Sequence, residues 1–120
     1  MEPLSETGRL GVYAIDQGAS WADLTSASFK AVDVAGDIAA AQVLRSLTIV
    51  NTHGSLELYV GFGLGAARAV TYAITVGPGA AFAVPAAALR SLAGANHTAI
   101  CVQGSGANTT GRLLAVWAPA

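Results

Sequence analysis

Two runs in which apolar and polar residues alternate, 44–50 and 56–62, set the expected architecture of this chain. The polar segment 51–55, which contains a glycine, separates the two runs. Successive side chains of a strand point to opposite faces, so each run predicts a β-strand with one apolar face. Two such runs joined by about five turn-forming residues are typical of a β-hairpin. We therefore expect these two strands to pair with each other.

Short strands are expected on both sides of that hairpin. They are residues 21–34 (one or two strands, or a short helix at 22–24), 38–43, 71–76, 81–84, 97–103 and 112–117, the last two around a polar hairpin loop. The only segment that suits a helix is 86–92, with at most two turns. This gives about seven or eight short strands with no crossover helices, which is typical of an antiparallel β-sandwich or jelly roll.

Residues 1–20 differ from the rest because isolated apolar residues are spaced among glycines and a proline. We expect an extended N-terminal arm over 1–20 and a β-sandwich domain over 21–120, since chain ends are often loose unless they are tied down. The apolar residues along the arm and at its junction are the candidate contacts with another subunit. They are Leu4, Leu10, Tyr13, Ile15 and Trp21.

The composition is rich in apolar and poor in charged residues. Apolar residues make up 53% of the chain and charged residues 11%, against about 25% charged in an average globular domain. Because a monomer relies on surface charge for solubility, apolar surface in contact with another protein is one explanation. The other is a sequence that is simply rich in alanine and glycine, and the composition alone leaves both open.

Charge also limits the possible partners. The net charge is −1, and the six cationic residues lie far apart in the sequence, whereas nucleic acids and anionic membranes are bound by clusters of Lys and Arg. The uncharged segment 69–89 has the length of a membrane span, but Gly77-Pro78-Gly79 and Pro85 would break such a helix. We expect neither a nucleic-acid partner nor a membrane partner.

No motif for catalysis, a cofactor or a metal emerges. Residues 61–66 match a dinucleotide-binding glycine pattern, but a strand rather than the required helix is expected to follow. His53 and His97 lack further ligands at metal-binding spacing, and Asp33 and Asp37 flank a turn, where Asp is common for backbone reasons. The expectation is a protein that is not an enzyme and needs no cofactor or metal.

Over roughly residues 40–118 the chain resembles the small capsid decoration (cement) proteins of tailed bacteriophages. The matching elements are RSLTIVN, LYVGFG, YAITVGPGAAFAVP, TAICVQGSG and LLAVWAP. The similarity is a pattern of strands and turns and not a diagnostic motif.

The resemblance implies a structural protein without catalysis, on the outer surface of a capsid assembled in a bacterial host. Its partners would be the major capsid protein and itself, as a homotrimer, and its arm could add a strand to a neighbour's sheet. The alternatives are a phage tail or baseplate protein, and a β-sandwich module that binds a ligand such as a glycan through Trp21, Trp117, Tyr13 or Tyr59.

Overall fold

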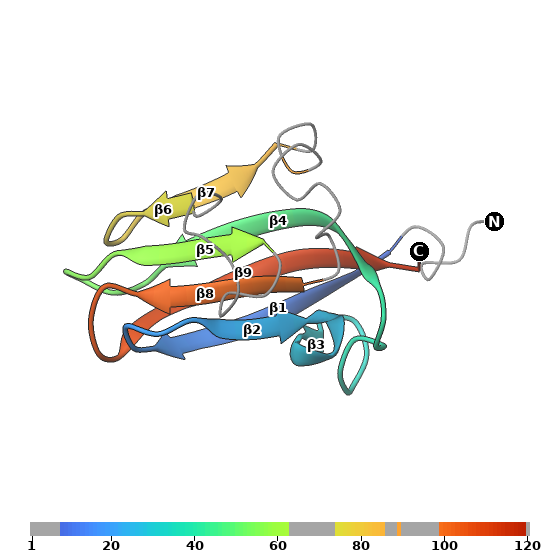
Figure 1. The fold of residues 1–120 in the computed structure, drawn as a ribbon. Helices are drawn as coiled ribbons and strands as arrows, with labels where there is room; N and C mark the ends of the chain where they lie inside the picture. The colour runs from blue at the N-terminus through green and yellow to red at the C-terminus, as the bar shows by residue number, and fades with distance from the viewer. Residues whose placement is uncertain (1–7, 63–73, 86–88, 90–98, 120) are drawn as a thin grey trace.

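The computed structural model describes residues 8–62, 74–85, 89 and 99–119, which form two antiparallel β-sheets. Figure 1 shows the two sheets as layers, with β1, β4 and β9 in one and β2, β5 and β8 in the other. Among these described residues, no helix is long and apolar enough to cross a membrane. The expected all-β class is confirmed.

The first sheet has five strands and the second has four. In spatial order, the five-stranded sheet consists of β3 (Lys30–Ala31), β1 (Arg9–Gln17), β9 (Thr109–Ala118), β4 (Val43–Asn51) and β7 (Ala81–Val84). The four-stranded sheet consists of β2 (Ala22–Thr25), β8 (Ala99–Gly104), β5 (Leu58–Phe62) and β6 (Ile74–Val76). A single 3-10 turn, η1 (Ser26–Ser28), follows β2.

Side chains from both sheets build one core between them. On β9 the alternate residues Leu113, Ala115 and Trp117 have no exposed surface, and Val60 of β5 and Val102 of β8 are equally buried. All five belong to a single cluster of buried apolar residues. The alternation predicted for strands therefore follows from one face of each sheet lying against the other sheet.

The prediction that 44–50 and 56–62 pair as a hairpin is wrong, although both segments form strands. β4 lies between β9 and β7 in the five-stranded sheet, whereas β5 lies between β8 and β6 in the other sheet. The polar link between them therefore crosses from one layer to the other. Packed sheets lie about 10 Å apart, a distance that a link of this length spans easily.

Two other links cross between the sheets in the same way. β6 and β7, on either side of the turn at 77–80, belong to different sheets, and so do β8 and β9. The expected hairpin loop between β8 and β9 is thus also a crossing between layers. Alternation locates a strand along the chain, but it does not say which strand lies beside it, because pairing partners in such a fold are distant in sequence.

The expected N-terminal arm is a strand over much of its length. β1 lies between β3 and β9 and pairs with β9 from Arg9 opposite Trp117 to Gln17 opposite Thr109. Residues 1–7 lie outside the described part. Glycine at position 11 allows this strand to lie close to its neighbours, because a Cβ there would come within 2.9 Å of side-chain atoms of Phe29 and Ile38.

Smaller differences concern residues 21–43. Residues 22–24 belong to β2 and not to a helix, and 38–42 form a link that precedes β4, so the strand expected over 38–43 begins only at its end. Of two apolar candidates, Phe29 is fully buried, whereas Val32 is 57% exposed. The helix expected over 86–92 lies outside the described residues, Leu89 excepted.

Candidate functional site

The residues expected to contact a partner do not all lie on the surface of the structure. Leu10 is 42% exposed on β1, whereas Ile15, five residues further on and on the opposite side of the strand, is only 3% exposed and belongs to the core. Tyr13 is half-buried, with its ring centroid 5.9 Å from that of Phe29. Ile15 is therefore not a surface contact, because odd-numbered residues of β1 face the other sheet. Leu4 lies outside the described residues.

Trp21, the fifth expected contact, lies against the four-stranded sheet. It is half-buried, and its six-membered ring would be 3.7 Å from a Cβ at Gly61. The missing side chain at Gly61 thus leaves room for the indole. Trp21 covers part of its own domain and contributes only partly to the surface.

The side of the five-stranded sheet that faces away from the core is largely apolar. Cross-strand pairing places Val12 beside Leu114 and Leu10 beside Val116, and Ala83 shares this face on β7. These residues are exposed or half-buried. Together with Val32 and Val50 they form what we name the outer apolar face.

Polar residues interrupt the outer apolar face without breaking it up. Ser46 and Thr48 lie beside Val116 and Leu114, the charged residue Lys30 lies beside Val12, and Asp16 and Arg112 lie toward the start of β9. An antiparallel sheet that faces water normally carries polar residues on that side. The sequence signal was the run LLAVWA at 113–118, since a continuous apolar run indicates a strand that is buried on both faces.

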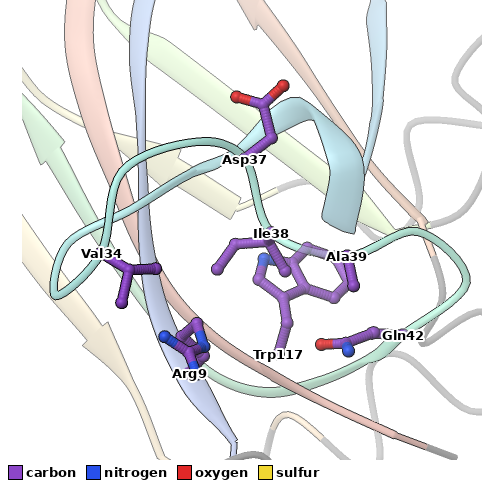
Figure 2. Close-up of a pocket in the computed structure, with 7 residues that line it drawn as sticks. All are labelled: Arg9, Val34, Asp37, Ile38, Ala39, Gln42 and Trp117. Atoms are coloured by element: carbon purple, nitrogen blue, oxygen red, sulfur yellow. The ribbon is translucent and has the colours of Figure 1, made fainter.

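A cavity of about 340 Å³ lies between the segment 32–42 and the end of β9. Its lining residues, shown in Figure 2, are Arg9, Val34, Asp37, Ile38, Ala39, Gln42 and Trp117. The segment above the cavity is held to the core at two adjacent residues: Ile38 N donates to Phe29 O over 2.8 Å, and Ser26 Oγ donates to Ala39 O over 2.7 Å. No local sequence pattern indicates this cavity, because its residues come from three separate parts of the chain.

Trp117 forms the floor of that cavity. Its side chain has no exposed surface, and its ring packs edge-on against Phe29 with centroids 5.3 Å apart. Within the described part of the chain, Trp117 Nε1 is the one buried side-chain nitrogen or oxygen without a hydrogen-bond partner. The indole face is therefore taken up by the core and does not offer a sugar-stacking surface, but its N–H remains without an acceptor.

The two aspartates considered as a carboxylate pair are each engaged with a different cation. Arg9 Nη1 donates to both carboxylate oxygens of Asp33 over 3.1 Å, and Lys30 Nζ lies 3.4 Å from Asp37 Oδ1. Both pairs are largely exposed, so each adds little to stability. Near the cavity, the positive charges of Arg9 and Lys30 are therefore balanced by the negative charges of the two aspartates.

His53 is half-buried and organises the link between the sheets. Its Nδ1 accepts hydrogen bonds from the backbone N–H groups of Ser55 and Leu56, each over 3.0 Å. His97 lies outside the described residues. Among the residues that the structure does describe, no three His, Cys, Asp or Glu side chains are grouped as metal ligands would be.

The structure thus offers two features with functional potential, the outer apolar face and the cavity above Trp117. Comparison with other proteins adds no relative to guide the choice between them. No family model matches the chain, and neither a curated protein sequence nor a solved structure is significantly similar to it.

Proposed function

We propose that this chain is a non-enzymatic structural protein of a virion. It binds the outside of a phage head as a homotrimer and joins neighbouring subunits of the major capsid protein. The observation that carries the proposal is the outer apolar face, because an apolar face of this breadth on a sheet is stabilised when another protein covers it. The small share of charged residues, 11% of the chain, points in the same direction.

The order of strand pairing supports assignment of the fold to the jelly-roll class. With the two-residue β3 set aside, the first strand β1 pairs with the last, β9, and β2 pairs with β8. The inner strands continue the scheme, since β4 pairs with β7 and β5 with β6. Jelly rolls are found in viral capsid proteins and in lectins. The fold therefore agrees with the proposal, although a fold does not by itself assign a function.

The outer apolar face suits binding in a repeated lattice. Apolar burial contributes about 25 cal/mol per Å², and much of this is offset by the entropy lost on association. A subunit that contacts both its own copies and the capsid gains avidity from several modest contacts. Strong single contacts, and hence a large charged interface, are not required.

Self-association is tested by replacing Leu114 at the centre of the face. Leu114→Lys places a charge in the proposed interface, and Thr75→Lys places the same charge on an exposed position of β6, in the other sheet. Sedimentation and native mass are measured at high micromolar concentration. We expect trimers for the wild type and Thr75→Lys, and folded monomers for Leu114→Lys. A wild type that stays monomeric would contradict the trimer.

Binding to the head is a separate measurement. The wild type is mixed with heads assembled from the major capsid protein alone, and the bound fraction is read after sedimentation. We expect the wild type and Thr75→Lys to sediment with the heads. If the protein forms trimers but stays in the supernatant, the proposed self-association stands. The proposal that the major capsid protein is its partner is then wrong.

A further inference from the structure

We propose that the cavity above Trp117 is a binding site for an uncharged small molecule with an apolar body and one hydrogen-bond acceptor, which accepts from Trp117 Nε1. This site is independent of the proposed role in the capsid. Its place in the fold is the end of the sandwich where segment 32–42 covers β1 and β9. All seven residues that line the cavity belong to the described part of the chain.

An unused hydrogen-bond donor lies at the floor of the cavity. Trp117 Nε1 is buried and has no hydrogen-bond partner, whereas most buried donors in folded proteins have one. Leaving such a group without an acceptor costs about 1–3 kcal/mol. An acceptor that enters the cavity would remove this cost, so the protein favours a ligand that carries one.

A single water molecule satisfies this donor poorly. A buried water needs two to four polar partners, and besides Gln42 the lining offers the apolar side chains of Val34, Ile38 and Ala39 and the ion-paired side chains of Arg9 and Asp37. Figure 2 shows the carboxylate of Asp37 pointing away from the indole. A ligand with a carbonyl or ether oxygen on an apolar body needs only one donor, the N–H of Trp117. The carbon atoms of the ligand then contact the apolar side chains that line the cavity.

Charge balance decides against an ion. Arg9 is the one cationic side chain in the lining and is already paired with Asp33, and the lining residue Asp37 is paired with Lys30. Neither an anion nor a cation would find an unopposed partner, and either would lose its hydration on entry. The volume of about 340 Å³ lies at the small end of ligand sites. The ligand is thus small and neutral.

Entry to the indole nitrogen requires a side-chain movement. Trp117 has no exposed surface, and in Figure 2 Ile38 lies beside the nitrogen of the ring. The backbone of Ile38 is held by its bond to Phe29 O. A change of the Ile38 rotamer would open the floor of the cavity while segment 32–42 stays in place.

The test uses two probes of nearly the same shape, cyclohexanone and methylenecyclohexane, of which only the ketone carries an acceptor. The full chain is titrated with each, and the indole N–H resonances are followed by ¹H–¹⁵N NMR. Trp117→Phe assigns the resonance, because the only other indole is that of Trp21. We expect cyclohexanone to shift the Trp117 N–H downfield and saturably, with half-saturation at about 1 mM, and methylenecyclohexane to leave it in place.

Two further variants separate binding in the cavity from general effects. Ala39→Leu places a larger side chain at the cavity, and Ala27→Leu makes the same change at an exposed position of η1. Ala39→Leu should weaken the response to cyclohexanone at least tenfold, and Ala27→Leu should leave it unchanged. Equal shifts with both probes, no saturable shift in the wild type, or an unchanged response in Ala39→Leu would each overturn the proposal.

Discussion

The side-chain amide of Asn51 donates to the carbonyl oxygen of Val76 over 2.9 Å and so joins the end of β4 in one sheet to the end of β6 in the other. The same nitrogen donates to Leu56 O over 2.9 Å, and Asn51 Oδ1 accepts from the backbone N–H of His53 over 2.9 Å. The residue is 1% exposed. Asn51 thus fixes the point where the chain leaves one layer for the other.

Replacing Asn51 by alanine should destabilise the fold strongly. The change leaves two carbonyl groups and one N–H near the core without this partner, and each costs about 1 kcal/mol or more. We expect a loss of about 3 kcal/mol in the free energy of unfolding, measured by urea denaturation. Thr75→Ala on the exposed side of β6 is the control and should change stability by less than about 0.5 kcal/mol. A loss in Asn51→Ala no larger than in the control would contradict the role of this amide.

Gly104 at the end of β8 should not tolerate a side chain. A Cβ there would overlap the side chain of Thr109 and come within 2.9 Å of Gln17 O. Because Gln17 O is backbone, the contact cannot be relieved by a rotamer change, and Gly104→Ala should cost about 3 kcal/mol. Thermal unfolding of Gly104→Ala is compared with that of Gly54→Ala, where a Cβ meets nothing within 4 Å. Equal melting temperatures would show that the crossing at 104–109 is loosely packed.

His53→Ala should loosen the link between β4 and β5. The two N–H groups of Ser55 and Leu56 lose their acceptor, but the link is partly exposed and water can replace it. The expected loss is therefore smaller, about 1 kcal/mol. Hydrogen exchange at these two amides should be faster in the variant, and exchange in the centre of β9 should be unchanged. Unaltered protection of Ser55 and Leu56 would argue against the role of the imidazole.

Tyr59 should ionise at higher pH than an ordinary tyrosine. Its hydroxyl donates to Glu57 Oε1 over 3.1 Å, and this hydrogen bond, with a smaller contribution from desolvation and from the charge of Glu57, raises the pKa of Tyr59 above 10.0. Because the folded state holds this proton more tightly, the stabilisation is complete below the ordinary pKa and is lost as the pH rises through the raised value. Glu57→Ala removes the acceptor and should lower the pKa of Tyr59, which absorbance at 295 nm measures against Tyr59→Phe. An unchanged titration in Glu57→Ala would rule out the hydrogen bond as the cause.

Local pattern was sufficient to find most strands but not to pair them. β4, β5, β7, β8 and β9 lie where alternation placed them, because a strand with one face in the core must alternate in sequence. The short links from β4 to β5, from β6 to β7 and from β8 to β9 all cross between sheets instead of closing hairpins. A short link of four to six residues serves either purpose, so only the packing of the two layers decides between them.

The candidate functional features depended still more on tertiary structure. Of the five residues expected at an interface, Leu10 is exposed, and Ile15 is buried because β1 is a strand in the sheet and not an arm. The outer apolar face exists only because β1, β9 and β4 lie side by side. The cavity above Trp117 brings together residues more than 70 positions apart in sequence.

The sequence by itself determined that the chain is built from short strands with few charges, because alternation and composition are properties of neighbouring residues. Which strands pair, which side of each faces the core, and that the indole N–H of Trp117 is left without an acceptor were decided only by the tertiary structure. The physical reason is that these properties depend on contacts between residues far apart in the chain, and such contacts form only when the two sheets pack together.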